Sequence, residues 1–316
     1  MKIVSADQQI ALTPLAGGVS SDIFRADLPS GVVCVKRALT RLKVAADWQV
    51  PVERNRSEVE WMRVAAAIVP DAVPAILGED REACAFAMAW LPPQQYPVWK
   101  ELLAAGTATD DMAARVGDTL GRIHAATADR PELARRFAND ALFHALRLDP
   151  YLVTAAGRHP RQAARLLALV DVTAGVRRTL VHGDFSPKNI LVGPRGPVIL
   201  DAECAVYGDP AFDLAFVLNH LLLKGVWHPS RRDAYAAMAR TLIGAYLAHV
   251  GWEDRALLEA RAAALLPGLL LARVDGKSPV EYVTGDGDRD AIRDFACAHL
   301  DAPVAKLEQL LQAWTT

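Results

Sequence analysis

The spacing of apolar and polar residues changes near residue 92. Before it, apolar segments rich in β-branched residues predict strands at Val32–Leu39 and Ala83–Leu91. Between them, Ser57–Val69 has apolar residues at helical spacing, with Ser57 as the expected N-cap and Glu60 three residues later. Prolines follow this helix and the second strand. The first part of the chain is therefore predicted to be small and rich in strands.

The remainder of the chain has mainly the spacing of amphipathic helices. Two short strands, Ile190–Val192 and Val198–Leu200, are expected to pair as a hairpin. Helices are expected at 110–127 and at about 161–172, 211–223, 231–249, 254–273 and 288–312. The pattern predicts an α+β protein with two lobes: a β-rich lobe over residues 1–91 and a larger, mainly helical lobe over residues 92–316.

Composition narrows the class of protein. The chain has 316 residues, of which 52% are hydrophobic, enough for a sizeable core, and its formal net charge is −2, which argues against a non-specific nucleic-acid binder. Short basic clusters such as Val52–Arg56 are expected to be solvated helix faces. There is no apolar run of about 18 residues and the first residues do not resemble a signal peptide, so a cytoplasmic protein without a membrane partner is expected. Four widely separated cysteines favour a reducing compartment over disulfides or zinc.

A short polar loop precedes the first strand of the predicted hairpin. It has the sequence HGDFSPKN and starts at His182, with Asp184 and Asn189 in the positions of the H-x-D-x-x-x-x-N catalytic loop of kinases. Asp184 is therefore the candidate that orients an acceptor hydroxyl, and Asn189 is expected to turn back toward Mg²⁺. His182 is expected to hold the loop by hydrogen bonds rather than to act as a base.

A second acidic group follows the hairpin. Asp201 stands at the end of the second strand, and hairpin pairing is expected to bring it beside Asn189. Oxygen ligands suit Mg²⁺. Glu203 lies on the same side by the period of two residues and is a candidate for a further ligand.

The β-rich lobe supplies candidates for phosphate binding. Lys36 lies on a predicted strand and is expected to contact the phosphates, held by a helix glutamate; Glu58 is preferred over Glu60, which the capping pattern would occupy. A turn of small residues before the strand is expected to cover the phosphates. Its candidates are Gly17, Gly18, Ser20 and Ser21. The Walker pattern is absent, so a P-loop is excluded.

The order of these features resembles the aminoglycoside phosphotransferase and choline kinase family, whose fold is similar to that of protein kinases. HGDFSPKN resembles the HGDxxxxN of that family, and YGDPAFDLAF, residues 207–216, resembles its GDPxxDLA signature. The resemblance extends over roughly residues 12–275. It implies a bilobal protein-kinase-like fold, with ATP and Mg²⁺ as cofactors. It also implies that Asp213 supports the catalytic loop and that the adenine contacts a hinge formed by Met88, Trp90 and Leu91.

Parts of the chain look most similar to the methylthioribose kinases of this family. The segment LLARVDGKSPVEY, residues 270–282, is similar in position to an arginine-bearing segment that helps to hold the sugar, which implies that Arg273 and Lys277 contact the substrate. For Arg273, a structural role is an equally weighted alternative to substrate contact: the residue could stabilise a helix C-terminus by its charge or form a salt bridge. This chain differs from those kinases in two ways. They lack the asparagine that stands at position 189 here, and this chain has only one arginine in the segment.

Taken together, these residues predict an ATP-dependent kinase that transfers the γ-phosphate to a hydroxyl of a small metabolite, with a sugar as one candidate. An antibiotic phosphotransferase is an alternative, because the aspartates of Thr284–Asp290 would suit a cationic aminoglycoside. A nucleotide-binding pseudokinase or sensor is the other alternative. Such a protein would normally have lost Lys36, Asp184 or Asp201, and all three are present. The expected partners are ATP and a small hydroxylated substrate.

Overall fold

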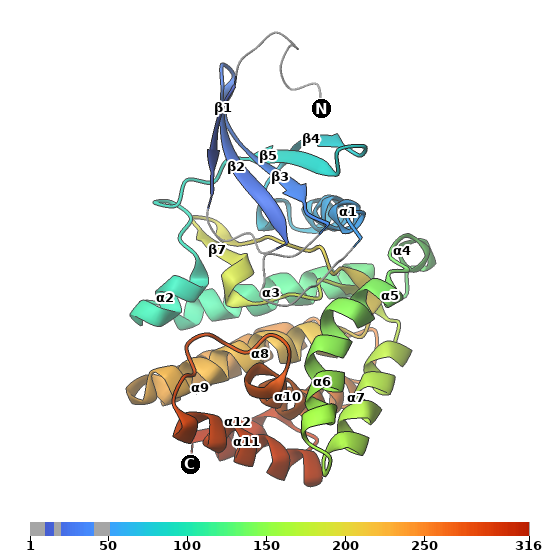
Figure 1. Ribbon diagram of the computed structural model, residues 1–316, viewed down its shortest axis with the longest axis vertical. Coiled ribbons are helices and arrows are strands. Elements are labelled where there is room, and N and C mark those ends of the chain that lie inside the picture. The colour runs from blue at the N-terminus through green and yellow to red at the C-terminus, as the bar shows by residue number, and fades with distance from the viewer. Residues whose placement is uncertain (1–9, 16–19, 41–50, 316) are drawn as a thin grey trace.

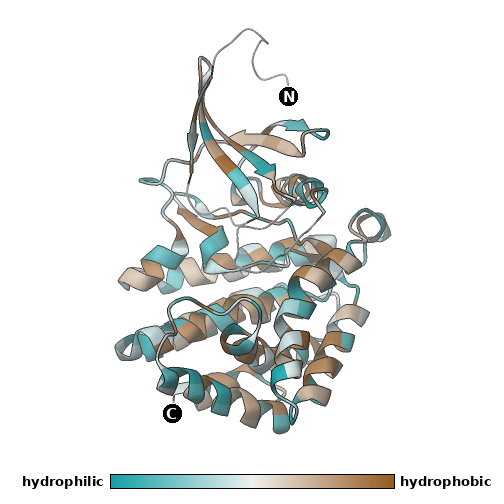
Figure 2. Ribbon diagram, viewed as in Figure 1, coloured by the Kyte–Doolittle hydropathy of each residue, from teal (hydrophilic) through white to brown (hydrophobic). Residues whose placement is uncertain are grey.

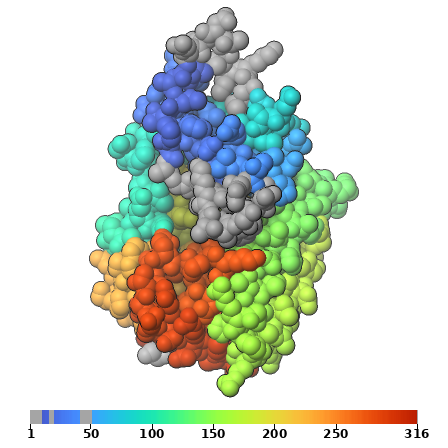
Figure 3. Space-filling view, viewed as in Figure 1, coloured from blue at the N-terminus to red at the C-terminus, as the bar shows by residue number. Residues whose placement is uncertain are grey.

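The computed structural model describes residues 10–15, 20–40 and 51–315. Gly17 and Gly18, two of the residues predicted to cover the phosphates, lie outside these ranges. A five-stranded antiparallel sheet lies at one end of the molecule, and most of the helices lie toward the other end (Figure 1). The space-filling view shows the first strands at one end and the last helices at the other (Figure 3). The predicted α+β class is confirmed.

The sheet has five strands in the order β1-β2-β3-β5-β4, and every neighbouring pair is antiparallel. The strands are β1 (Ala11–Pro14), β2 (Ser21–Leu28), β3 (Gly31–Ala38), β4 (Ile76–Asp80) and β5 (Ala85–Ala89). Strands β3 and β5 match the two predicted strands. The sequence pattern missed β1, β2 and β4 because none of them alternates between buried and exposed residues. β1 is exposed throughout, β4 has no buried residue, and β2 has only Ser21 and Ala26 buried.

Helix α1 (Arg54–Ile68) begins three residues before the predicted start. Ser57 is inside the helix, where its hydroxyl accepts a hydrogen bond from Nδ2 of Asn139 (3.0 Å), so the predicted N-cap is wrong. The guanidinium of Arg54 donates to the carbonyls of Leu39 (2.7 Å) and Pro51 (2.9 Å). Arg54 is buried, so the expectation of a solvated basic face is also wrong for this residue.

The helical part contains eleven α-helices among the described residues. They are α2 (Trp99–Ala105), α3 (Asp110–Thr127), α4 (Pro131–Arg136), α5 (Asp140–Phe143), α6 (Thr154–Arg158), α7 (Ala163–Gly175), α8 (Pro210–Trp227), α9 (Arg232–Leu247), α10 (Arg255–Asp275), α11 (Asp286–Asp301) and α12 (Leu307–Thr315). A π-helical segment, His144–Val153, joins α5 to α6, and short 3₁₀ turns occur at Pro70–Ala72, Pro187–Asn189 and Pro229–Arg231. The single helix predicted over 288–312 is wrong, because the chain leaves the helix around Pro303 and α12 starts afterwards.

Four short strands frame the loops of the helical part. They are β6 (Thr179–Val181), β7 (Ile190–Gly193), β8 (Gly196–Ile199) and β9 (Val206–Gly208). β7 and β8 form the predicted hairpin, with Ile190 opposite Ile199. β6 pairs with β9. That pair was not predicted, because three buried residues are too few to show a period.

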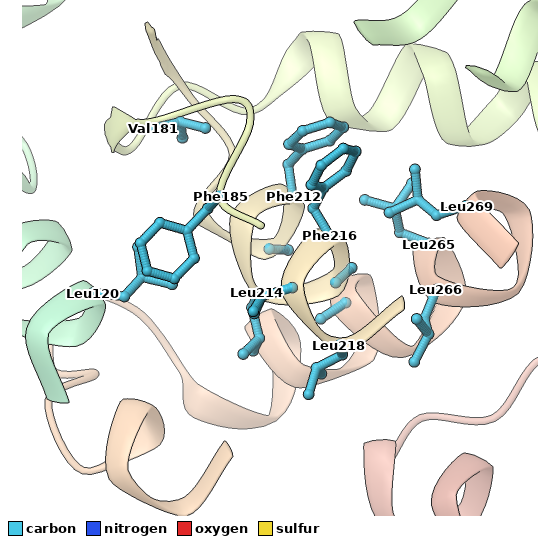
Figure 4. Close-up of a cluster of buried hydrophobic side chains, with 14 of the residues drawn as sticks. Leu120, Val181, Phe185, Phe212, Leu214, Phe216, Leu218, Leu265, Leu266 and Leu269 are labelled. Carbon is cyan, nitrogen blue, oxygen red and sulfur yellow. The ribbon is translucent and has the colours of Figure 1, made fainter. Parts of the chain in front are cut away.

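Helix α8 is the centre of the helical core. Every residue from Pro210 to Val226 is buried, and the helix packs against α9 and α10. The rings of Phe212 and Phe216 stack with their centroids 5.4 Å apart, and leucines of α10 lie beside them (Figure 4). The outer helices carry hydrophilic and hydrophobic residues together, as expected of helices with one face toward a core (Figure 2).

The start of α8 is fixed by charged groups. Oδ1 of Asp209, the residue before the helix, accepts the N–H of Ala211 (3.0 Å), and Arg261 of α10 forms an ion pair with the same carboxylate (3.0 Å).

Within the described part of the chain, no helix combines the length and apolar character needed to cross a membrane. The four cysteines are free thiols.

We predict that Phe212→Ala lowers the free energy of unfolding by about 3–5 kcal/mol, because it leaves a cavity beside Phe216 in a core that has little room to relax. Urea unfolding measures the change. Leu257→Ala is the control, since Leu257 is 61% exposed and its truncation should cost little. Equal losses for both variants would contradict the assignment of α8 as the core helix.

Candidate active site

The loop between β6 and β7 holds Asp184 among several hydrogen-bond donors. Nδ2 of Asn189 donates to the backbone carbonyl of Asp184 (3.0 Å) and to its Oδ2 (2.9 Å). The ammonium of Lys188 lies 3.0 Å from the same oxygen, and the guanidinium of Arg147 lies 3.1 Å from it. Burial alone would raise the pKa of Asp184, but Arg147 and Lys188 outweigh it, and the pKa falls to about 2. The carboxylate is therefore ionised at neutral pH.

Arg147 was not found from the sequence. It belongs to the π-helical segment, where it is buried and donates through Nη1 to the carbonyl of Leu146 (2.7 Å) and through Nε to the carbonyl of Gly183. It stands far from the loop in sequence, and the irregular turn gives no helical period. π-Turns often occur at functional sites, but nothing in the sequence marks this one.

His182 and Asp213 position the loop. The carboxylate of Asp213, on α8, accepts the backbone N–H of His182 (2.7 Å) and of Gly183 (2.9 Å). The imidazole of His182 lies 3.0 Å from the carbonyl of Leu200 through Nε2, and its Nδ1 accepts the N–H of Asp184 (3.1 Å). Burial lowers the pKa of His182, which favours the neutral ring. Both residues contact the loop through hydrogen bonds, and their assignment as structural residues stays a prediction.

Gly183 has a conformation that few other residues adopt. Its φ is +78°, and a Cβ at this position would lie 2.6 Å from the carbonyl oxygen of Cys204. A larger residue here would therefore strain the backbone and clash with the chain behind the loop.

Lys36 lies between two carboxylates. Its ammonium is 2.8 Å from Glu58, the preferred partner, and forms a second ion pair with Asp201. Burial would lower the pKa of Lys36, but Asp201 and Glu58 outweigh it and raise the pKa above its usual value. Glu60 instead pairs with Arg63 (2.6 Å).

The two carboxylates differ in their surroundings. Burial raises the pKa of Glu58 to about 7 although Lys36 is adjacent. Burial acts in the same direction on Asp201, but Lys36 and Lys188 outweigh it, so the pKa of Asp201 lies below its usual value. The side chain of Asp201 is 27% exposed, and its φ is +67°. A non-glycine residue in this region is costly and is often found at functional sites.

Comparison with known proteins places this geometry in a family. The sequence model of the phosphotransferase enzyme family matches residues 11–258, which is most of the chain. The chain belongs to the phosphotransferase enzyme family. The match spans Lys36, the loop with Asp184, and Asp201, so the residues described above lie within the region that defines the family.

Individual members of the family are distant. The chain is 26% identical to the methylthioribose kinase of Pectobacterium atrosepticum over 251 residues, which cover 70% of this chain and 62% of that enzyme. It spans 51–62% of the length of three curated methylthioribose kinases that it matches.

Solved structures show the same fold. A choline kinase from Cryptosporidium parvum is similar with a TM-score of 0.59 and 11% identity, covering 98% of this chain and 95% of that one. An amicoumacin kinase, solved in complex with AMP-PNP, Ca²⁺ and Ami, is similar with a TM-score of 0.55 and 14% identity, covering 96% of this chain and 91% of that one.

In this family member, Glu203 contacts an arginine. Its carboxylate lies 2.9 Å from Nε of Arg54, and the same guanidinium donates to the backbone carbonyls of Ser20 and Leu39. Ser20 and Ser21 are buried here, beside the start of β2. Arg54 thus connects the loop after β8, through Glu203, with residues at the ends of β2 and β3. The sequence did not predict this role.

The candidate metal ligands are Asn189 and Asp201. Among the described residues, no three His, Cys, Asp or Glu side chains gather as a metal site. Nδ2 of Asn189 donates to Asp184, which leaves Oδ1 as the side-chain oxygen that could bind a cation. Mg²⁺ commonly takes one or two protein oxygens together with phosphate and water, and the donors present fit this pattern.

The predicted hinge residues precede the catalytic loop in the sequence, and the predicted substrate residues follow it. Met88 pairs with Cys34 across β5 and β3, and the ring of Trp90 lies under the guanidinium of Arg25, while Leu91 is half-buried. At the end of α10, Nη1 of Arg273 donates to the hydroxyl of Tyr151 (3.2 Å). Lys277 is paired with Asp149 (2.7 Å) and is half-exposed.

We predict that Gly183→Ala lowers the free energy of unfolding by about 1–3 kcal/mol, because alanine must adopt a positive φ against the carbonyl of Cys204. Gly157→Ala is the control. Gly157 is exposed in α6 with open space around its Cα, and alanine there should stabilise the protein by about 0.5–1 kcal/mol. Denaturant unfolding measures both, and a neutral Gly183→Ala would refute the strain described for the loop.

Proposed function

We propose that this protein is an ATP-dependent kinase that phosphorylates a hydroxyl of a small molecule. The observation that carries the proposal is the position of the ionised Asp184, which Asn189 holds in place, in the same site as the Lys36–Asp201 ion pair. Phosphoryl transfer needs a group that orients the acceptor, a cation near the phosphates and oxygen ligands for Mg²⁺. One site in this chain offers all three.

The sheet and the segment after it would hold the nucleotide. Lys36, fixed by Glu58, would contact the phosphates, and the backbone at Met88, Trp90 and Leu91 would contact the adenine. Asn189 and Asp201 would hold Mg²⁺, which when bound neutralises charge on the phosphates. Glu203 is a weaker candidate for a ligand, because Arg54 already engages its carboxylate. The amicoumacin kinase of the same fold, solved with AMP-PNP, supports the choice of nucleotide.

Asp184 would act on the acceptor. The acceptor hydroxyl donates a hydrogen bond to its carboxylate, which aligns the oxygen with the γ-phosphorus. A bond then forms between these atoms while the bond from the phosphorus to the β–γ bridging oxygen breaks, and ADP leaves. The hydroxyl proton passes to the carboxylate late, after bonding to phosphorus has made the hydroxyl acidic. Arg147 and Lys188 keep Asp184 charged and in place.

The similarity to methylthioribose kinases supports a sugar as one candidate acceptor. An aminoglycoside has less support. Two of the aspartates that would suit a cationic antibiotic, Asp286 and Asp290, pair with Arg289 and Arg293 of their own helix. A sensor without activity would not need Asp184 in place, so its retention favours the enzyme.

We predict that Asp184→Asn reduces turnover about a hundredfold or more, because the amide cannot accept the hydroxyl proton. Binding of MgATP should change less than threefold, since the side chain keeps its size and its contact with Asn189. ATP consumption and calorimetric titration measure the two quantities. Asp171→Asn, at an exposed position of α7, is the matched control and should leave both unchanged. Full activity of the Asp184 variant would exclude the mechanism.

Asp201→Ala is predicted to remove the Mg²⁺ dependence of nucleotide binding, because the carboxylate is the charged ligand of the proposed site. The same titrations with Mg²⁺ and with EDTA measure it. Wild-type affinity and metal dependence in this variant would show that the metal binds elsewhere.

A further inference from the structure

A pocket lies beside the catalytic loop on the helical side. Lys188 of the loop, His220 and Lys224 of α8, and Arg273 of α10 are among its lining residues. Lys188 connects it to the proposed site, because its ammonium is 3.0 Å from Oδ2 of Asp184. The pocket is thus adjacent to the carboxylate that we assign to the acceptor hydroxyl. The segment joining α10 to α11, which carries Tyr282 of the lining, crosses one face of the molecule (Figure 1).

Lys224 is the unusual member of this pocket. Its side chain is buried at 1% exposure, and its ammonium makes no hydrogen bond to any described residue. It lies 4.1 Å from the ring centroid of Trp227 and 3.9 Å from that of Tyr282. Aromatic faces offset part of the cost of burying a cation, but they supply no acceptor for its three protons. Burial and Lys100 lower the pKa of Lys224 to about 8, so it is mostly charged at neutral pH.

Two further donors in this pocket also lack acceptors. Nε of Arg273 and the hydroxyl of Tyr282 are buried without a hydrogen-bond partner among the described residues, although Nη1 of Arg273 is engaged by Tyr151 and Ser278. Buried polar atoms are nearly always hydrogen-bonded in native proteins. Three unsatisfied donors on side chains that line one pocket therefore indicate a ligand with several acceptor oxygens.

The charges of the pocket give the sign of that ligand. Lys100 is paired with Glu281, and Lys188 with Asp184. Lys224 and Arg273 have no carboxylate partner in the described part of the chain. His220 is neutral and adds no positive charge, because burial places its pKa well below its usual value. The balance is positive. A cationic acceptor would be repelled here, whereas an anion would be attracted and hydrogen-bonded.

We propose that the acceptor is a small hydroxylated anion whose carboxylate or phosphate group is bound by Lys224, Arg273 and Tyr282 while its hydroxyl faces Asp184. This substrate class rests on the kinase function proposed above. The anionic group would accept hydrogen bonds from the unsatisfied donors of the pocket. Where the acceptor has several hydroxyls, the distance between its anionic group and each hydroxyl would determine which hydroxyl oxygen reaches the γ-phosphate.

The test uses binding measured without nucleotide, so that it does not depend on turnover. Calorimetric titrations compare small hydroxylated compounds of different charge: the neutral glycerol and ribose, the anions glycerate, glycerol 3-phosphate and ribose 5-phosphate, and the cation ethanolamine. The proteins are the wild type, Lys224→Met and Tyr282→Phe. Lys306→Met, at an exposed position, is the matched control. MgATP is titrated into each, and thermal unfolding is recorded for each.

The proposal expects an anionic member to bind the wild type and the Lys306 variant at least tenfold more tightly than its neutral counterpart. Lys224→Met should remove this preference without lowering the melting temperature, because the lysine has no hydrogen bond to lose. Carboxylate and phosphate are distinguished by glycerate and glycerol 3-phosphate. Tyr282→Phe should weaken the same ligand by a smaller factor.

Other results overturn the proposal. These are equal binding of neutral and anionic members, preference for ethanolamine, or no binding of any anion while MgATP still binds. A loss of MgATP affinity in Lys224→Met would assign the pocket to the nucleotide. A drop in melting temperature with equal weakening of all ligands would make Lys224 structural. If anions bind but MgATP does not, the anion site stands and the kinase function fails.

Discussion

The carboxylate of Asp213 joins the hydrophobic core to the site. It lies on the most buried helix of the molecule, and it is satisfied by two backbone N–H groups of the loop that carries Asp184, and by His124 behind it (3.3 Å). A buried carboxylate without donors would be very costly, so the loop must present those groups. This requires the positive φ of Gly183, which in turn requires that no Cβ stand against Cys204. The packing of α8 thus determines where Asp184 lies.

Two ion pairs, one of them partly exposed at Asp201, connect the sheet side to the loop after β8. Lys36 reaches Asp201, and Arg54 of α1 reaches Glu203, which is two residues further along. In the first pair, the ammonium of Lys36 also contacts Glu58 (2.8 Å), so it is held from two sides. In the second pair, Nε of Arg54 lies 2.9 Å from the carboxylate of Glu203. The two pairs therefore fix the position of Asp201 relative to the strands that would hold a nucleotide. The acidic residues at 201 and 203 thus have different partners: Asp201 contacts Lys36, and Glu203 contacts Arg54.

The sequence predicted most of the residues that meet in the site, because they lie in short segments with fixed spacing. The hairpin of β7 and β8 follows from two apolar triplets and a Gly-Pro turn, and it carries Asp201 toward Asn189. Lys36 and Glu58 were predicted to meet, and the structure contains that pairing. Ser57 failed as a cap because α1 begins at Arg54, whose side chain contacts Leu39, Pro51 and Glu203, all outside the helix.

What the sequence could not predict depends on long-range contacts. Arg147 and Lys224 each stand on helical segments where a lone basic residue usually indicates a solvated surface, and only the packed structure shows that both are buried. The groups proposed to act on the nucleotide and on the transferred phosphate would be needed for any hydroxyl acceptor, so they would not select one. Selection must come from the groups beyond Asp184. A cation placed beside Lys224 and Arg273 would lose its water and gain only repulsion, whereas an anion would exchange water for charged donors. On the proposal made above, buried charge on α8 and α10 would therefore select the acceptor.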